Sequence, residues 1–337
     1  MATIKDVADK AGVSVATVSH VINDTRYVSS ELTERVNEAM DEIGYHPNAV
    51  ARSLKTNKTQ TIGLIASDLS NPFFSTLLRG VEDRALEEDY SVIVCNTDET
   101  LDKERLYIDV LTQQKIDGLL IAPTGKDDED LLNLQERGVS IVFIDREIKG
   151  IEADAVLSDN VTGASTAIRH LVQLGHKRIG IILGLESVST TRERLRGYKN
   201  VLKEKGIGYD PNLVKRGFSQ VAGGIEATAE LLDLSNSPSA IFSANNLMTI
   251  GAMKEIQRRD YSCPEEISLV GFDDFEWAST FKPKLTTIAQ APYEIGKKAT
   301  DALLNRIEGC SGEAKEIRIP TELKVRESTA DFKEPNT

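Results

Sequence analysis

The order of hydrophobic and polar positions divides the chain into two parts. In the first 44 residues, apolar side chains recur three and four positions apart, which is the period of an amphipathic helix. Three short helices are therefore predicted, with apolar stripes formed by Ile4, Val7, Ala8 and Ala11, by Val18, Val21 and Ile22, and by Leu32, Val36, Ala39, Met40 and Ile43. Together these stripes are enough for a small helical core.

A tight turn joins the first two predicted helices. Thr3 can cap the first helix with Asp6 at the capping-box position, Gly12 supplies the turn, and Ser14 can cap the second helix. In a helix-turn-helix of this kind, the start of the second helix enters the major groove of DNA. An ordinary helical hairpin has a similar pattern, but the third predicted helix and the helix-prone segment after it favour a DNA-binding unit. We therefore expect sequence-specific DNA binding through the outward residues Val15, Ala16, Thr17 and His20.

A short segment with helical propensity follows the third helix. Residues 47–55 begin with Pro47, a residue favoured in the first turn of a helix. A helix this short is unstable alone in water. Residues 43–60 also contain Arg52, Lys55 and Lys58 and no acidic residue, so positive charge gathers there.

From about residue 61, short apolar runs alternate with amphipathic stretches. Such runs are typical of strands buried on both faces of a parallel sheet with helical crossovers. Two successive series occur, at 62–66, 91–95, 118–122 and 141–144, and then at 178–183, 213–218, 240–243 and 268–272. The predicted fold is thus a small all-α headpiece followed by an α/β core of two similar parallel-sheet lobes.

Polar and aromatic residues follow the predicted strands in both series. Ligands of open α/β sheets bind at the carboxyl ends of the strands. Carboxylate, amide and guanidinium groups can grip vicinal hydroxyls, and phenylalanine rings can cover the C–H faces of a sugar. This pattern predicts a site for a small polyhydroxylated molecule at these strand ends, with candidate residues at 71–74, 145–146, 192–194, 218, 245–246, 273–274 and 290.

The chain resembles the lactose-repressor and galactose-repressor family of bacterial transcription factors. The resemblance is carried by residues 1–8, 18–23 and 49–55, where the headpiece is especially similar to the ribose and purine repressors. It implies that residues 47–55 form a hinge helix that folds on the operator, with Leu54 wedged into the minor groove. The DNA-binding residues that it implies, together with those from the helix pattern, are Thr3, Val15, Ala16, Thr17, His20, Asn23, Arg52, Leu54 and Lys55.

The core resembles the periplasmic ribose-binding protein. Ten of the strand-end positions match its sugar-contacting positions one by one: Asn71, Phe73, Phe74, Asp145, Arg146, Arg194, Phe218, Asn245, Asp273 and Gln290. One position differs, because Ala122 stands where that protein has an asparagine. The purine repressors lack this set, so the resemblance favours D-ribose or a related pentose as effector. A different pentose, a phosphorylated sugar or a purine remains an alternative. We expect induction, in which sugar weakens operator binding, although the sequence does not fix the sign.

The resemblance also implies a domain organisation. A headpiece (1–46) and a hinge helix with its linker (47–60) precede a sugar-binding and dimerisation core (61–330) and a tail (331–337). Lobe 1 is expected at about 61–160 and 291–320, and lobe 2 at about 161–290 and 321–330, so the chain crosses between lobes three times. The polar C-terminal segment lacks the leucine-heptad helix that joins dimers of the lactose repressor, and a homodimer is expected.

Composition adds constraints on location and chemistry. No apolar run is long enough to cross a bilayer, the N-terminus does not resemble a signal peptide, and Cys95, Cys263 and Cys310 are isolated. A cytoplasmic, nucleoid-associated protein is expected, and the net charge of −13 helps to restrict DNA contact to the headpiece.

Enzymatic motifs are missing from the sequence. It contains no Walker A loop, dinucleotide fingerprint or HExxH zinc motif. The adjacent carboxylates Asp273 and Asp274 should point in opposite directions, which makes them poor partners for acid–base chemistry. We expect no enzyme activity, no cofactor and no metal. A free-standing sugar-transport receptor is the main rival, but it should carry a secretion signal and no helix-turn-helix. The sequence leaves open a protein co-regulator such as a phosphocarrier.

Overall fold

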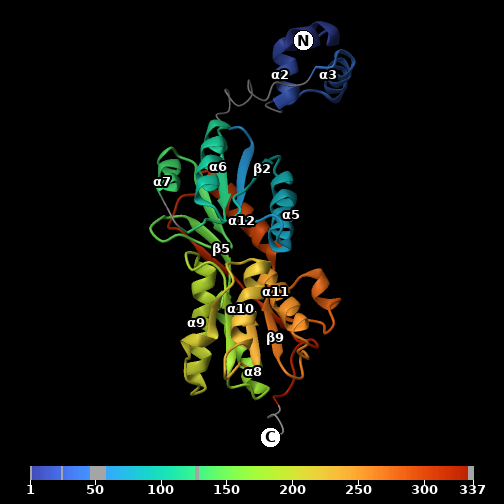
Figure 1. Ribbon diagram of the computed structural model, residues 1–337. Coiled ribbons are helices and arrows are strands. Elements are labelled where there is room, and N and C mark those ends of the chain that lie inside the picture. The colour runs from blue at the N-terminus through green and yellow to red at the C-terminus, as the bar shows by residue number, and fades with distance from the viewer. Residues whose placement is uncertain (1, 24–25, 46–57, 126–128, 333–337) are drawn as a thin grey trace. The chain divides into compact units, whose positions relative to one another are not determined.

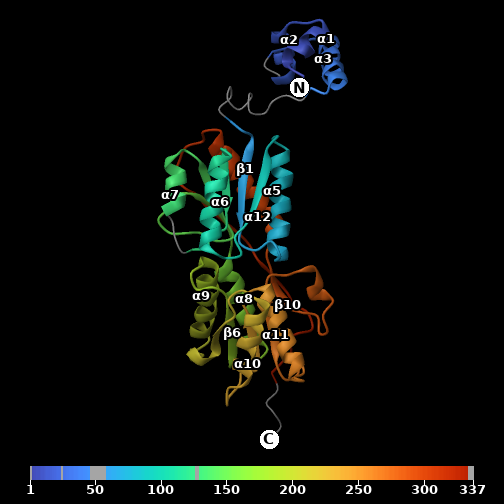
Figure 2. The same ribbon diagram turned by 45° about the horizontal axis from the view of Figure 1, so that its top comes forward.

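The computed structural model describes residues 2–23, 26–45, 58–125 and 129–332, which belong to two compact units, Met1–Thr59 and Gln60–Thr337. The first unit contains α1 (Ile4–Ala11), α2 (Val15–Asn23) and α3 (Ser30–Ile43) (Figure 2). The predicted hinge at 47–60 falls almost wholly on residues 46–57, outside the described residues.

The predicted turn chemistry of the headpiece is confirmed. The Thr3 hydroxyl accepts a hydrogen bond from the Asp6 backbone at 3.3 Å, while the Asp6 carboxylate accepts one from the Thr3 backbone at 2.8 Å. Gly12 ends α1 with a φ of 65°, a left-handed conformation that glycine adopts easily. The Ser14 hydroxyl then accepts a hydrogen bond from the Thr17 backbone at 3.1 Å. The turn therefore holds α1 and α2 at a defined angle.

The apolar stripes of the three helices form one core. Val7, Val18 and Val36 are fully buried at its centre. Arg35 of α3 donates a hydrogen bond of 2.6 Å to the carbonyl oxygen of Ala11, which ties α3 to the end of α1. Ser29 holds the N-cap position of α3, although its side chain makes no capping hydrogen bond.

The second unit contains two six-stranded sheets, one in each lobe (Figure 1). Their strand orders are β11-β5-β4-β3-β1-β2 and β12-β10-β9-β8-β6-β7, so β1 corresponds in position to β6, β2 to β7 and β4 to β9. The elements of lobe 1 are β1 (Thr61–Ala66), α5 (Pro72–Leu86), β2 (Ser91–Asn96), α6 (Leu101–Gln113), β3 (Gly118–Ile121), α7 (Glu129–Glu136), β4 (Ser140–Ile144), β5 (Asp154–Ser158), α12 (Pro292–Ile307) and β11 (Glu316–Ile319).

Lobe 2 repeats this alternation of strands and helices. Its elements are α8 (Asn160–Gln173), β6 (Ile179–Leu183), α9 (Ser189–Glu204), η1 (Pro211–Leu213), β7 (Val214–Arg216), α10 (Val221–Leu232), β8 (Ala240–Ser243), α11 (Asn246–Arg258), β9 (Ser268–Phe272), η2 (Glu276–Ser279), β10 (Thr286–Ala289) and β12 (Glu322–Lys324). The two-lobed α/β prediction is confirmed, with one difference. β12 runs antiparallel to β10, because the chain returns to lobe 2 directly after β11.

Helices cover both faces of each sheet. In lobe 1, α5 and α12 pack on one face, and residues of α6 and α7 contribute to the apolar core on the other. In lobe 2, α8 packs with α9 and α10 packs with α11. The central strands are buried between these layers, which explains their continuous apolar runs in the sequence, whereas the edge strands β2, β7, β11 and β12 are partly exposed.

The chain passes between the two sheets three times: after β5, after β10, and between β11 and β12. These connections place the carboxyl ends of the parallel strands of both sheets toward the same interlobe region. None of the helices in the described part of the chain is long and apolar enough to cross a membrane.

Candidate functional site

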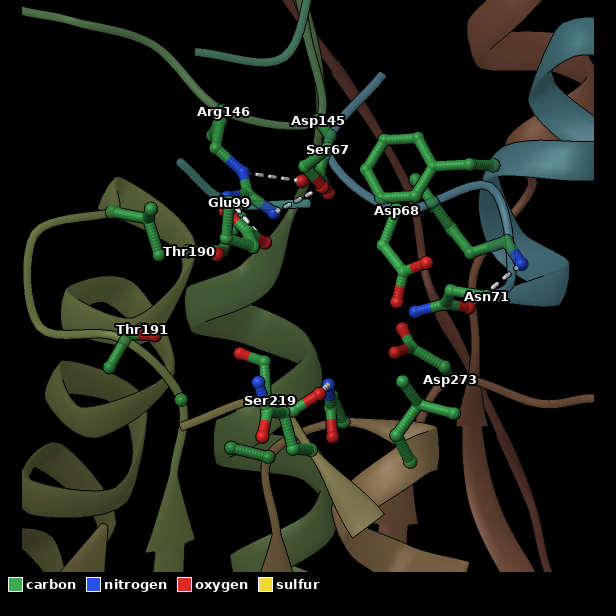
Figure 3. A pocket seen from close by; sticks show the side chains of 18 of the residues that line it. Ser67, Asp68, Asn71, Glu99, Asp145, Arg146, Thr190, Thr191, Ser219 and Asp273 are labelled. Carbon is green, nitrogen blue, oxygen red and sulfur yellow. Dashed lines mark hydrogen bonds and ion pairs between the residues drawn. The ribbon is translucent and has the colours of Figure 1, made fainter. Parts of the chain in front are cut away.

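A cavity of about 250 Å³ lies between the carboxyl ends of strands from both lobes. Figure 3 shows side chains from lobe 1 and lobe 2 facing one another across it. We call this cavity the effector pocket. All ten residues predicted for a ligand site line it: Asn71, Phe73, Phe74, Asp145, Arg146, Arg194, Phe218, Asn245, Asp273 and Gln290. Their role in binding stays a prediction.

Arg146 anchors the lobe 1 side of the pocket. It follows β4, and its guanidinium is almost fully buried. Its Nε donates to Asp145 at 2.9 Å, and its Nη1 donates to both carboxylate oxygens of Glu99 at 2.8 and 3.1 Å (Figure 3). Burial lowers the pKa of Arg146, but the two carboxylates outweigh burial and hold that pKa above its ordinary value. The charge of Arg146 is thus compensated within lobe 1.

Arg194 of α9 lies on the lobe 2 side and has different partners. Its Nε donates to the side-chain oxygen of Asn160 at 2.9 Å, and its Nη1 donates to the Ala244 carbonyl oxygen at 2.6 Å. Its guanidinium carbon lies 3.8 Å from the centre of the Phe272 ring. Burial lowers the pKa of Arg194, and the charges of Asp273 and Asp145 offset only part of this effect. The two groups that accept hydrogen bonds from Arg194 are thus both neutral.

Asp273, directly after β9, is buried beside Arg194. Its carboxylate accepts hydrogen bonds from the Gln290 amide and, at 3.3 Å, from the Asn246 backbone. Burial raises the pKa of Asp273, against the opposing charge of Arg194 and the hydrogen bond from Gln290. The other amide atom of Gln290, Oε1, is buried and has no hydrogen-bond partner among the described residues.

Asp274 has a separate environment from Asp273, as the sequence predicted. It forms an ion pair of 2.8 Å with Arg326 and accepts a hydrogen bond of 2.7 Å from Thr287. Burial raises the pKa of Asp274, but these partners outweigh burial and hold it below its ordinary value. The two adjacent carboxylates therefore do not form an acid–base pair.

Asn71 connects the two lobes. Its side-chain oxygen accepts a hydrogen bond of 3.0 Å from the Phe73 backbone, which caps α5. The same oxygen accepts a hydrogen bond of 2.8 Å from the side chain of Asn246 in lobe 2. Asn71 thus has a structural role as a helix cap and also lies at the wall of the pocket.

The aromatic residues of the pocket differ in exposure. Phe73 and Phe74 are buried in the lobe 1 core, with their rings edge to face at 5.1 Å, and they also line the pocket. Phe218, after β7, is 50% exposed. An apolar ring that is half exposed at the cavity can cover the face of a ligand.

Six non-glycine residues with positive φ lie at this pocket, and they follow corresponding strands of the two sheets. Asp145 after β4 has a φ of 61°, and Asp273 after β9 has a φ of 73°. Asp98 and Glu99 follow β2, while Phe218 and Ser219 follow β7, all with a φ between 48° and 61°. Such backbone is sparsely populated and is found preferentially at functional sites.

Sequence reasoning missed several residues that line the pocket. Glu99 is the most important of these because it holds Arg146, and its position directly after a predicted strand was the available signal. Asn246, a strand-end candidate beside Asn245, does not line the pocket, but its side chain bonds to Asn71 across the lobes. Other lining residues with hydroxyl groups that were not predicted are Ser67, Ser70, Thr190, Thr191 and Ser219.

None of the described residues that line the pocket is a histidine. His170 bonds to Thr329, and His176 bonds to Ser239 and Ser268. Burial lowers the pKa of both histidines. Within the described ranges, no group of three or more His, Cys, Asp or Glu residues has the geometry to hold a metal ion.

The headpiece presents part of the predicted DNA-binding set on its surface. Val15 is 44% exposed and Ala16 is exposed, while Thr17, His20 and Asn23 are partly exposed. Thr3 is exposed at the start of α1, and Asn23 donates a hydrogen bond of 2.7 Å to the carbonyl of Ser19. The remaining predicted residues, Arg52, Leu54 and Lys55, lie outside the described residues. DNA contact by this set stays a prediction.

Comparisons with known proteins agree with this architecture. Residues 3–48 match the family described as "Bacterial regulatory proteins, lacI family", and residues 59–327 match "Periplasmic binding proteins and sugar binding domain of LacI family". A curated relative from Vibrio atlanticus, the HTH-type transcriptional repressor PurR, is 37% identical over 97% of this chain and 98% of its own.

Two solved structures are also similar. One is the lac repressor dimer bound to operator and the anti-inducer ONPF, with a TM-score of 0.86, 30% identity, and coverage of 98% of this chain and 99% of that chain. The other is a LacI family transcriptional regulator from Enterococcus faecium with bound ribose, with a TM-score of 0.74, 33% identity, and coverage of 81% and 100%.

The fold and the matched regions thus define a class of two-lobed, DNA-binding transcription regulators. The chain belongs to the LacI family of bacterial regulatory proteins.

Proposed function

We propose that this regulator represses sugar-utilisation genes and that a small neutral sugar, D-ribose or a related pentose, controls its affinity for operator DNA. The observation that carries the proposal is the effector pocket, in which two guanidiniums, several amides and several carboxylates from both lobes surround one cavity. These groups supply both donors and acceptors, which a polyhydroxylated ligand requires.

The charge of the pocket favours a neutral effector. Five carboxylates line it, those of Asp68, Asp98, Glu99, Asp145 and Asp273, against two guanidiniums, those of Arg146 and Arg194. An anionic ligand would be repelled by this excess of negative charge inside a partly buried cavity. Free ribose is thereby favoured over a sugar phosphate.

A purine effector is the second candidate, and the curated relatives favour it. The PurR proteins of Aliivibrio salmonicida, Photobacterium profundum and Vibrio atlanticus are 35–37% identical to this chain over nearly its whole length. In contrast, the ten pocket residues match the sugar-contacting set of ribose-binding protein, and the similar Enterococcus faecium regulator has bound ribose. The effector is therefore the first property to measure.

The effector would act by bridging the lobes. A sugar held by Arg146 in lobe 1 and by Arg194 and Asp273 in lobe 2 binds one interlobe angle better than another and shifts that equilibrium. The Asn71–Asn246 hydrogen bond is a direct contact between the lobes that any such change must alter. In a homodimer, this shift would change the spacing of the headpieces, and linkage requires that operator DNA weaken sugar binding to the same extent.

Calorimetry with the full chain tests the effector directly. D-Ribose, ribose 5-phosphate and hypoxanthine are titrated separately, and thermal unfolding is recorded with each. We expect ribose to bind and to raise the Tm, by an amount corresponding to about 2.7 kcal/mol at a concentration of 100 times Kd. Binding of hypoxanthine alone would replace the sugar proposal with the purine one, and tighter binding of the phosphate would refute the charge argument.

A second experiment tests the operator side. The wild-type chain selects a duplex from a random library, and binding is then measured for that duplex and for a shuffled one. We expect a near-palindromic site and expect Leu54→Ala to weaken specific binding by about tenfold, because the minor-groove wedge is lost. Binding to the shuffled duplex should change little. An asymmetric site, or equal losses on both duplexes, would contradict the proposal.

A further inference from the structure

An ion pair joins the two lobes beside the passages of the chain between them. Arg318 lies on β11 in lobe 1, and its Nη1 donates a hydrogen bond of 2.8 Å to the carboxylate of Glu193, on α9 in lobe 2. The same nitrogen donates to the carbonyl oxygen of Ser158, at the end of β5, at 3.2 Å. Because β5 and β11 are neighbours that both lead into lobe 2, Arg318 lies where two of the three passages begin.

Both partners of this ion pair are partly shielded from water. The side chain of Glu193 is 12% exposed and that of Arg318 is 28% exposed, so salt screens the pair less than an exposed one. A second contact between the lobes, from the Ser187 hydroxyl to the Thr124 carbonyl oxygen at 3.1 Å, joins neutral groups. A charge-assisted hydrogen bond is stronger than a neutral one. A rotation of the lobes that separates Glu193 from Arg318 therefore breaks the stronger kind of bond.

Arg318 has an acidic partner in each lobe. Its Nη1 bonds to Glu193 in lobe 2, while its Nε donates to the carboxylate of Glu316 on its own strand. Burial lowers the pKa of Arg318, but the hydrogen bonds to Glu193 and Glu316 outweigh burial and hold that pKa above its ordinary value. If the lobes rotate apart, Arg318 can keep Glu316, whereas Glu193 loses its partner in lobe 1. The surroundings of Glu193 thus depend on the interlobe angle.

Glu193 also connects this ion pair to the effector pocket. The carboxylate oxygen that binds Arg318 accepts a hydrogen bond of 3.0 Å from the side-chain nitrogen of Asn160, which donates to the Ser158 carbonyl as well, at 3.2 Å. Asn160 is buried at the start of α8, and its side-chain oxygen accepts the 2.9 Å bond from Nε of Arg194. Because a carboxylate only accepts, Glu193 turns the nitrogen of Asn160 toward itself and the oxygen toward Arg194.

We propose that Glu193 is a positioning residue for the effector, which aligns Arg194 through Asn160 and makes this alignment depend on the interlobe angle through Arg318. This inference rests on the proposed function, because Arg194 is one of the groups expected to hold the sugar. Glu193 is not among the described residues that line the effector pocket, so it acts through its neighbours. A ligand that binds an aligned Arg194 favours the interlobe angle at which the Glu193–Arg318 pair is closed.

Calorimetry with D-ribose on variants of the full chain measures the effect on affinity. Glu193→Ala removes the charged acceptor that orients Asn160, and we expect the Kd to rise about fivefold. Arg318→Ala releases Glu193 from lobe 1 and should raise the Kd about threefold. The double variant should raise it no more than about fivefold, because both residues act along one path. Glu193→Gln keeps an oxygen for Asn160 and should lie between the wild type and Glu193→Ala.

Two matched controls remove similar charges without breaking the path. Arg196 approaches the other carboxylate oxygen of Glu193 at 4.0 Å from within lobe 2, so Arg196→Ala is the control for Arg318→Ala. Glu204 pairs with Arg169 at 2.8 Å and joins α8 to α9 near their other ends, so Glu204→Ala is the control for Glu193→Ala. Both controls should leave the Kd unchanged, and thermal unfolding checks that each variant is folded. Losses in the controls as large as in the test variants would overturn the positioning role.

A measurement without ligand follows the alignment itself. The Nε–H group of Arg194, which is bonded to Asn160, is observed by heteronuclear NMR and assigned by its loss in Arg194→Lys. We expect Glu193→Ala to shift this signal and to speed its exchange with water, because the orientation of Asn160 is less fixed. Glu204→Ala should leave the signal in place.

The outcomes separate this inference from the proposed function. If the wild type binds ribose but Glu193→Ala changes neither the Kd nor the Arg194 signal, the inference is overturned and the sugar effector stands. If the wild type does not bind ribose, the sugar effector fails, and a shifted Arg194 signal in Glu193→Ala would still support the positioning role. Additive losses in the double variant would overturn the coupling through Arg318.

Discussion

The two lobes present corresponding strand ends to one pocket, but they surround their pocket arginines with different partners. In lobe 1, Arg146 is surrounded by the carboxylates of Glu99 and Asp145, and its pKa is raised. In lobe 2, Arg194 bonds to an amide and a carbonyl and stacks on Phe272, and its pKa is lowered by burial. Similar folds thus hold one compensated and one largely uncompensated charge.

From this difference we infer a structural role for Arg146 and propose a ligand-recognition role for Arg194. The charge of Arg146 is already balanced, so much of its interaction energy stabilises lobe 1. The positive charge of Arg194 is offset mainly by the nearby carboxylate of Asp273. Burial raises the pKa of that carboxylate. A ligand that forms hydrogen bonds with Arg194 and Asp273 should therefore gain more binding free energy than a ligand that contacts only Arg146. This asymmetry can be tested directly.

The largest expected effect is on stability. Arg146→Ala leaves Glu99 and Asp145 without their shared partner, and we expect it to lower the free energy of unfolding by about 3–5 kcal/mol. Arg194→Ala removes hydrogen bonds to neutral groups and a cation–π contact, and should lower it by about 1–3 kcal/mol. Urea unfolding followed by circular dichroism measures both.

A double variant sharpens this comparison. Adding Glu99→Gln to Arg146→Ala removes one uncompensated carboxylate and should restore part of the lost stability. If Arg194→Ala destabilises the protein as much as Arg146→Ala, the distinction between the two lobes is wrong.

The next effect is on ligand affinity and contrasts two adjacent carboxylates. Asp273→Asn removes a charge that faces the pocket, and the affinity for ribose should fall by about tenfold. Asp274→Asn is the matched control, because Asp274 is bound to Arg326, and it should leave the affinity nearly unchanged. Calorimetry compares the two variants, and equal losses would remove the special role of Asp273.

The smallest expected effect is on how folding stability depends on pH, and it again contrasts Asp273 with Asp274. The pKa of Asp273 is raised, so its ionisation disfavours the folded state, and this penalty is relieved below its ordinary pKa of about 3.8. The pKa of Asp274 is lowered, so its stabilising contribution is present above about 3.8 and is lost as the pH falls.

Thermal unfolding between pH 3 and pH 7 measures this contrast. Relative to the wild type, Asp273→Asn should gain a few degrees in Tm as the pH rises, while Asp274→Asn should lose a few degrees over the same range. Parallel curves for the two variants would contradict the opposite pKa shifts.

The sequence was sufficient for the parts of the fold that depend on local pattern. The capping box at Thr3, the turn at Gly12 and eight strands, six of them buried, all follow from residues close together in the chain. The pattern did not reveal β5, β10, β11 or β12 as strands. Of these, β11 and β12 are short edge strands with exposed charged residues, and their pairing depends on distant segments.

The candidate site shows the same limit. Strand-end positions identified all ten predicted lining residues, because the fold brings strand ends together wherever they lie in the sequence. The partners of those residues were not predictable in this way. Glu99 is 47 positions from Arg146, and Asn246 is 175 positions from Asn71, so only the folded chain reveals these bonds.

The three passages of the chain between the sheets have a consequence for synthesis on the ribosome. Helix α12 packs on α5 in lobe 1 but is made about two hundred residues later, and β12 completes the sheet of lobe 2 only after β11 has joined that of lobe 1. Neither lobe can therefore finish folding before nearly the whole polypeptide has emerged, whereas the headpiece needs only its own first residues. A nascent chain will carry a finished DNA-reading unit ahead of two unfinished lobes, whose long-range pairings form slowly.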